Sequence, residues 1–259
     1  MRRAAFLLLL PCLSVPAAAA EPDGAEIIRR ADKDHRSKDE RAVVDMVLVT
    51  DTGEKQRRKL ELCTKTGEGE DDMNLIRFLE PATVRGTAVL TVEASDRADD
   101  QWLYLPALKK SKRIASSQKT QRFAGTDFTY EDLRTENLSA FTYERKRTEK
   151  VGDRDCWVVE ARPKPGTESG YKRRLIFVDR ERYLVLKVDY FDTDDVEAKP
   201  TKTLENRDYE QKDGLWRAKQ ARMTDHQRKT QTAWRIEERA INPGLPDSTF
   251  TVAQLERGL

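Results

Sequence analysis

The sequence has 259 residues, of which 37% are apolar, 36% are charged and 7% are aromatic, a mixture typical of a folded globular protein and not of a multi-span membrane protein or a low-complexity tail. Lys and Arg number 48, Asp and Glu number 46, and there are two histidines, so the formal net charge is only +2. With so little net charge and so few histidines, we expect no nucleic-acid binding, no metal, no cofactor and no enzymatic activity.

Residues 1–20 have the pattern of a cleavable signal peptide. Two arginines precede an apolar run from Ala4 to Val15, and the small residues Ala18, Ala19 and Ala20 lie at the expected cleavage site near Ala20. The run is shorter than the ~20 apolar residues of a spanning helix, so a membrane anchor is the less favoured alternative. We therefore expect residues 21–259 to be one soluble domain exported to a bacterial periplasm.

Cysteine usage leaves two alternatives open. Cleavage of the signal peptide would remove Cys12 and leave Cys63 and Cys156, which lie far apart in the sequence. An even number of cysteines in an oxidising compartment permits one disulfide. Two separately packed thiols are the other alternative, because free cysteines behave as small buried apolar residues.

The predicted secondary structure is one short helix followed by many strands. The helix runs from Glu26 to about Arg36, where Ile27, Ile28 and Ala31 form an apolar stripe. Beyond it, β-branched and apolar residues alternate with charged ones between turn-forming residues, which is typical of antiparallel strands. The twelve predicted strands span residues 42–50, 56–65, 73–80, 86–93, 101–105, 140–148, 155–162, 171–178, 183–191, 202–210, 215–224 and 230–240.

Many of these strands are apolar on one side and charged on the other, for instance Leu60 and Leu62 against Glu61. A sheet of some twelve strands usually curls, and its apolar face must be covered. The helix and an insertion between Lys109 and Leu138, partly helical from Thr129 onward, are the available cover. The sequence therefore predicts a single mainly β domain, a curled antiparallel sheet with an incompletely filled apolar groove on its concave side.

No pattern typical of an enzyme stands out. The motif G-x-S-x-G is absent, and two histidines do not easily supply a catalytic triad. The acidic cluster at residues 192–197 lacks the glycine and the distant glutamate of an EF-hand loop, which favours a solvated turn over a calcium site.

Two features near the insertion each allow a structural and a functional interpretation. A basic cluster directly follows an apolar strand and is either a solvated turn or a contact for anionic head groups or an acidic partner. Its residues are Lys109, Lys110, Lys112 and Arg113. The aromatic residues Phe123, Phe128 and Tyr130 either pack in the core or line a ligand groove.

The run WLYLPALKKSKRIASSQKTQRFAGTDFTYEDL, from Trp102 to Leu133, closely resembles the central signature of the LolA-like outer-membrane lipoprotein-sorting proteins. Four further segments fit the same family, so the resemblance covers nearly all of residues 21–259. They are MVLVTDTG (46–53), LIRFLEPATVRGTAVL (75–90), DGLWRAKQARMTDH (213–226) and LPDSTFTVAQLERGL (245–259). The resemblance implies a half-open antiparallel β-barrel with a helix-bearing lid that holds acyl chains in its concave side. It also implies membership of a branch that accompanies RND-type inner-membrane lipid exporters.

We therefore expect a periplasmic carrier that shields the acyl chains of a lipoprotein or lipid during transfer toward the outer membrane. The alternative is an adaptor or sensor module with the same barrel plugged by its own side chains, acting with an RND-type transporter or an envelope-stress regulator. A hydrolase is a third and weaker hypothesis. The predicted lipid-binding residues, groove lining first and lid last, are Met46, Leu48, Leu60, Leu62, Ile76, Phe78, Leu90, Trp102, Tyr104, Phe123, Phe128 and Tyr130.

Overall fold

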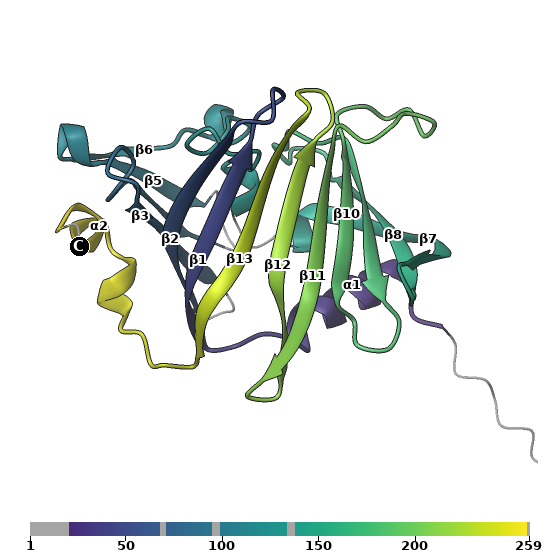
Figure 1. Ribbon diagram of the computed structural model, residues 1–259. Coiled ribbons are helices and arrows are strands. Elements are labelled where there is room, and N and C mark those ends of the chain that lie inside the picture. Colours follow the sequence, from purple (N-terminus) through teal and green to yellow (C-terminus); the bar gives the residue numbers. More distant parts are fainter. Residues whose placement is uncertain (1–20, 68–70, 95–98, 134–137, 258–259) are drawn as a thin grey trace, which may run out of the picture.

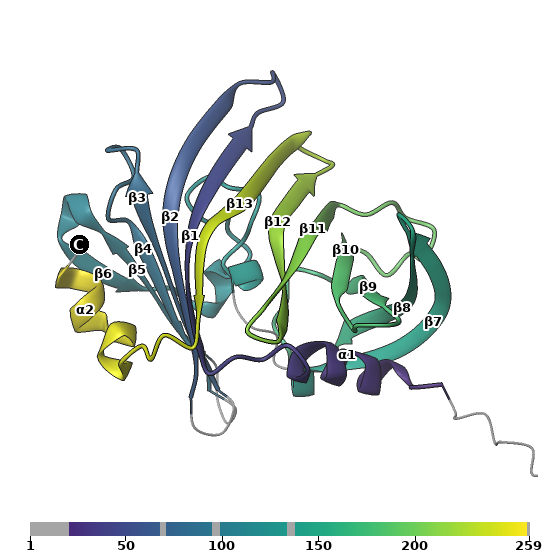
Figure 2. The ribbon, with the colours of Figure 1, turned by 60° about the horizontal axis from the view of Figure 1, so that its bottom comes forward.

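One antiparallel sheet makes up most of the molecule (Figure 1). The structure is a computed structural model that describes residues 21–67, 71–94, 99–133 and 138–257. The predicted signal peptide, residues 1–20, lies outside the described residues. Within them the sheet has thirteen strands, and it is curved but not closed into a barrel (Figure 2). The predicted half-open, mainly β architecture is therefore confirmed.

The first half of the sheet has the strands β1 (Asp39–Val49), β2 (Lys55–Thr66), β3 (Asp72–Glu80), β4 (Ala88–Val92), β5 (Asp100–Leu105) and β6 (Lys110–Arg113). The second half has β7 (Phe141–Val151), β8 (Arg154–Pro163), β9 (Arg173–Asp179), β10 (Val185–Phe191), β11 (Lys202–Lys212), β12 (Leu215–Asp225) and β13 (Thr230–Ile241). The helices are α1 (Gly24–Lys33) and α2 (Val252–Arg257).

The strand order is β6-β5-β4-β3-β2-β1-β13-β12-β11-β10-β9-β8-β7. Each half is thus a meander of neighbouring hairpins, and the halves join where β1 pairs with β13, with Met46 opposite Trp234. The strands β6 and β7, although consecutive in the chain, form the two edges of the sheet. The segment that links them therefore crosses from one edge to the other, and it is the insertion expected from the sequence.

The helix α1 begins after Asp23, whose side chain accepts a hydrogen bond from the backbone N–H of Glu26 at 2.8 Å. This is the usual way to satisfy a free N–H group at a helix start. The buried face of α1 carries Ile27 and Ile28, which pack on strands of the second half of the sheet. Figure 2 shows α1 across the open side of this half, whereas α2 lies beside β4 and β6 at the other end.

Side chains alternate between the two faces of each strand. On the concave face, Val44 and Met46 of β1 pack with Leu60 of β2 and with aromatic residues of the insertion. On the convex face of β2–β5, the C-terminal segment covers the sheet through Phe250 and Leu255. The part of β2–β5 beneath this segment is consequently buried on both faces.

The described residues of the insertion contain less helix than expected. Its described residues form a β strand, β6, and the 3-10 turns η3 (Ser116–Gln118) and η4 (Glu131–Leu133), and a further turn, η5 (Leu138–Ala140), precedes β7. Near the expected helix start, Asp132 accepts hydrogen bonds from the backbone N–H and the hydroxyl of Thr129 at 2.7 and 2.9 Å. Such local side-chain bonds compete with the helical pattern and favour a turn.

The two cysteines among the described residues are unbridged. Cys63 is buried in β2 beneath the C-terminal segment, and Cys156 is buried in β8 in a separate apolar cluster. Of the two alternatives left open by the sequence, the structure therefore has the separately packed thiols.

Candidate functional site

The insertion fills the concave side of the first half of the sheet. Phe123 is 1% exposed and its ring stacks on that of Phe78, with centroids 5.2 Å apart. The Tyr130 ring also contacts that of Phe123, with centroids 5.9 Å apart. Further along the sheet, Phe128 stacks on Trp234 at 4.8 Å. The three aromatic residues singled out in the sequence thus act as a plug against the concave face, and we call residues 119–133 the plug.

Buried polar groups fasten the plug to the second half of the sheet. The ammonium group of Lys202 donates to the main-chain oxygen of Asp127 at 2.9 Å and to the hydroxyl of Tyr171 at 3.2 Å. That hydroxyl donates in turn to the Asp132 carboxylate at 2.9 Å. Burial, with the nearby Asp132 charge, raises the pKa of Tyr171 well above its usual value, so this hydroxyl stays a donor.

Two further carboxylates of the plug are anchored in the same way. Asp127, which is 1% exposed, accepts from the hydroxyl of Thr232 of β13 at 2.7 Å, and its backbone N–H donates to the same hydroxyl oxygen at 2.9 Å. Glu131 accepts from the backbone N–H of Gly170 at 2.8 Å and pairs with Arg174 at 3.1 Å. Removing one partner of a buried pair such as Glu131 and Arg174 typically costs about 3–5 kcal/mol, so this pair resists displacement of the plug.

One guanidinium contacts the plug from the first half of the sheet. Arg58 of β2 donates to the main-chain oxygen of Ala124 at 2.6 Å and lies over the Phe78 ring at 5.3 Å. Burial lowers the pKa of Arg58, which still leaves it charged at neutral pH. Arg58 therefore connects β2 to the same turn that carries Phe123.

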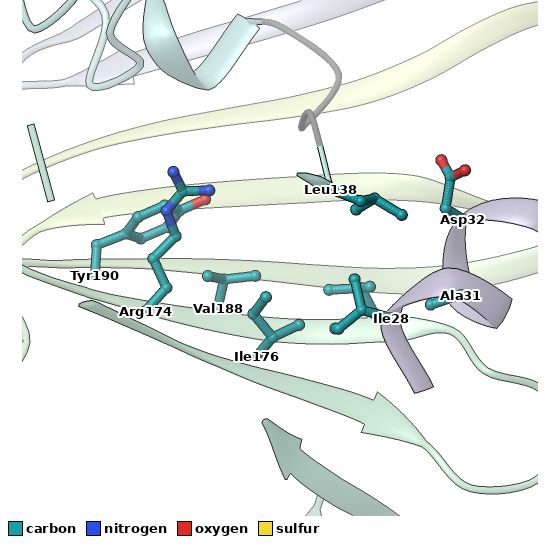
Figure 3. A pocket seen from close by; sticks show the side chains of 9 residues that line it. Ile28, Ala31, Asp32, Leu138, Arg174, Ile176, Val188 and Tyr190 are labelled. Carbon is teal, nitrogen blue, oxygen red and sulfur yellow. The ribbon is translucent and has the colours of Figure 1, made fainter. Parts of the chain in front are cut away.

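A cavity of about 270 Å³ remains on the concave side, between α1 and the strands β9 and β10. Figure 3 shows Ile28 and Ala31 of α1 facing Ile176 and Val188 of the sheet across it. Polar side chains lie at its two ends: Asp32 at one, and Arg174 with Tyr190 at the other. Its volume is close to the lower end of the ~300–1,000 Å³ of ligand pockets, and its middle is apolar.

The structure separates the predicted lipid-binding residues into two groups. Nine share the concave face: Met46, Leu48, Leu60, Leu62, Ile76, Phe78, Phe123, Phe128 and Tyr130. The other three, Leu90, Trp102 and Tyr104, lie on the convex face, where they pack beneath the C-terminal segment. Placing these three in the concave groove was wrong, because β4 and β5 are apolar on both faces and alternation alone does not identify the concave one.

The basic cluster lies away from the cavity. Lys110, Lys112 and Arg113 are exposed on β6, an edge strand paired with β5, and Arg113 forms an ion pair with Asp100. Lys109 is the residue that joins this strand to the preceding 3-10 turn η2 (Pro106–Leu108). We call residues 106–113 the basic hairpin.

The sequence prediction missed the residues that line the cavity. Ile28 was in the apolar stripe of the expected helix, and Ile176 and Val188 lay in expected strands, but no pattern marked them as neighbours. The alternation of apolar and polar residues around Ile176 and Val188 was the same as in every other strand with one apolar side. Only the pairing of β9 with β10, which sets Val188 opposite Ile176, brings them together under α1.

The described residues hold no group of three or more His, Cys, Asp or Glu side chains placed to bind a metal ion. Over the same part of the chain, no helix has the length and apolar character needed to cross a bilayer.

Comparison with known proteins places this arrangement in a family. A family model described as "uncharacterized protein" matches residues 70–257. An outer membrane lipoprotein-sorting protein domain from Vibrio parahaemolyticus is 33% identical, with a TM-score of 0.84 over 90% of this chain and 98% of that one. A DUF1329 family protein from Desulfovibrio piger is 29% identical, with a TM-score of 0.83 over 90% and 97%.

A LolA superfamily protein from Nitrosomonas europaea shares the fold at 18% identity, with a TM-score of 0.70 over 89% of this chain and 98% of that one. No curated protein matches the sequence significantly. The match to the Vibrio domain over almost its whole length agrees with the curved open sheet, the α1 cover and the central signature. The chain therefore belongs to the LolA-like outer-membrane lipoprotein-sorting protein family.

Proposed function

We propose that this protein is a periplasmic carrier that shields an acyl chain of a lipoprotein or lipid during transfer toward the outer membrane. The observation that carries the proposal is the apolar cavity between α1 and the sheet, lined by Ile28, Ile176 and Val188. Membership of the lipoprotein-sorting family supports it. The resemblance to companions of RND-type exporters makes such an exporter the candidate partner, which co-purification from membranes would test.

The size of the cavity defines how a long chain binds. Burying an acyl chain of about 15 methylenes contributes roughly 12 kcal/mol at ~0.8 kcal/mol per methylene, before association costs are subtracted. A cavity of about 270 Å³ takes only the first part of such a chain. The rest reaches the first half of the sheet when the plug, with Phe123 and Tyr130, leaves the concave face. Competition between plug and cargo then lowers the affinity and permits release.

The direct test combines lipid extraction with a matched pair of variants on α1. Ala31 lines the cavity, whereas Ala25 is exposed on the same helix. Ala31→Phe fills the cavity and should abolish most binding of a fluorescent fatty acid, while Ala25→Phe should bind like the native protein. Mass spectrometry of extracts from the native protein should show an acylated species. Absence of any bound or bindable lipid, with both variants folded, would contradict the carrier function.

One observation favours a second candidate, an interaction module without cargo. Phe78 is fully buried against Phe123, so the plug occupies the first half of the concave face as core residues would. An adaptor of this kind would recognise a transporter or a stress regulator through its outer surface. If the protein is such an adaptor, no lipid is extracted from it. The variant Ala31→Phe then captures the partner protein as well as the native protein does.

A further inference from the structure

Two large apolar side chains are strongly exposed in the described part of the chain. Leu108 is 64% exposed at the tip of the basic hairpin, and Val196 is 68% exposed in the loop between β10 and β11. Their surroundings differ in charge. Val196 lies among Asp194, Asp195 and Glu197, whereas lysines follow Leu108.

The tip that carries Leu108 is structurally defined. The 3-10 turn η2 ends at Lys109, whose φ of 49° is left-handed and whose backbone N–H donates to the Pro106 oxygen at 3.1 Å. Pro106 packs against the neighbouring turn at Gly86, where an added Cβ would lie 3.1 Å from the proline ring. The backbone N–H of Ser111 donates to Glu256 of α2 at 3.0 Å. Leu108 is thus exposed on a braced turn.

The positive charge of the tip is largely uncompensated. Lys109, Lys110 and Lys112 are exposed, and within the described residues none of them forms an ion pair. Arg85, exposed on the turn beside Gly86, donates only to the main-chain oxygen of Leu79. Against these four cations stands the carboxylate of Glu256, because Asp100 is already paired with Arg113.

We propose that the basic hairpin docks the protein on a bilayer surface rich in anionic lipid, with Leu108 inserted among the head groups and the lysines beside the phosphates. An exposed apolar side chain on a hairpin that also carries several cations matches the boundary between acyl chains and anionic head groups. The acidic loop around Val196 has the opposite charge, and such a surface repels it.

The expected strength is that of a reversible contact. Each lysine near an anionic surface contributes about a fivefold change in partition, and burial of a leucine side chain contributes at least about tenfold. The charge contribution falls with salt, since the screening length is about 10 Å at 0.1 M ionic strength. The inference goes beyond the proposed carrier function and needs no cargo, because β6 and the cavity lie toward opposite ends of the sheet.

The test is sedimentation of the protein with lipid vesicles at low salt. One vesicle preparation is phosphatidylcholine alone, and the other contains phosphatidylglycerol at about one third of the lipid. The variants are Leu108→Ser, the double variant Lys110→Gln with Lys112→Gln, and Val196→Ser as the matched control at the other exposed apolar side chain. Circular dichroism and the melting temperature verify that these surface variants fold.

We expect the native protein to bind the anionic vesicles and not the neutral ones. Leu108→Ser should weaken binding at least about tenfold, and the double lysine variant about 25-fold. Val196→Ser should bind like the native protein. Equal binding by Leu108→Ser, or no binding to anionic vesicles, would overturn the proposal, and the second result would leave an acidic protein surface as the partner. Fatty-acid binding in the cavity is measured separately, so failure of one proposal is distinguishable from failure of the other.

Discussion

Replacing Phe123 by alanine tests whether the plug is part of the core and whether it competes with cargo. The side chain is 1% exposed, and its ring contacts those of Phe78 at 5.2 Å and Tyr130 at 5.9 Å. A Phe→Ala change at such a position costs about 3–5 kcal/mol, which includes the cavity and the lost aromatic pairs. The free energy of unfolding of a domain is about 5–15 kcal/mol, so Phe123→Ala should fold with much reduced stability.

The same change should increase lipid affinity. If about 3 kcal/mol of plug packing is lost, the form with the plug displaced becomes about a hundredfold more populated relative to the closed form. Binding of a long fatty acid should then strengthen by up to that factor. The assays are urea denaturation, read as a shift in midpoint at unchanged slope, and titration with a fluorescent fatty acid in the absence of urea.

Phe250→Ala is the matched control, because Phe250 is 4% exposed on the convex face beneath the C-terminal segment. It should lower stability by a similar amount and leave lipid affinity unchanged. A destabilisation below about 1 kcal/mol for Phe123→Ala would show that Phe123 is not packed as described. A destabilised variant with native lipid affinity would refute competition between plug and cargo.

Three further predictions concern buried polar groups. Burial raises the pKa of Cys63 to about 12 and that of Cys156 to about 11. At pH 8 their thiolate fraction, and hence their rate of reaction with a chromogenic disulfide reagent, should be more than about a hundredfold lower than in urea-unfolded protein. Rapid labelling of the native protein would contradict this. Lys202→Met leaves buried oxygen acceptors without their donor and should cost about 3–5 kcal/mol in urea denaturation; a loss below about 1 kcal/mol would show that this anchor is not needed. Burial raises the pKa of Asp179, but hydrogen bonds from Arg154 and two backbone N–H groups outweigh this effect and leave the pKa lowered from 3.8. The carboxylate therefore stabilises the fold above about pH 4 and loses this effect as the pH falls through the lowered pKa. Asp179→Asn should be less stable than the native protein at pH 7 and approach its stability in acid, and a pH-independent difference would contradict the assignment.

Most strands were predictable because one face of the sheet is polar over much of its area. The alternation of Leu60 and Leu62 with charged neighbours identified β2, and similar patterns identified the other predicted strands. β6 escaped prediction since Lys110–Arg113 has exposed side chains on an edge and is held only by backbone pairing with β5. The six-residue helix α2 is too short for a helical period to be visible.

The site was less predictable than the fold for a related reason. A strand that is buried on both faces carries no polar side to identify the concave one, and β4 and β5 are of this kind. Leu90 and Tyr104 were therefore assigned to the wrong face. The cavity depends on how α1 lies over β9 and β10, a contact between segments about 150 residues apart, and single-strand alternation contains no information about it.

The pairing of β1 with β13 has a consequence for how the protein is made. Val44 lies opposite Ile236, so the two halves of the sheet are joined by the first and the last strand of the chain. A nascent polypeptide that has not reached residue 230 leaves β1 with one long unpaired edge, which is a template for association with other chains. Truncated products should thus be insoluble or rapidly degraded, and complete folding must wait until synthesis of the final hairpin.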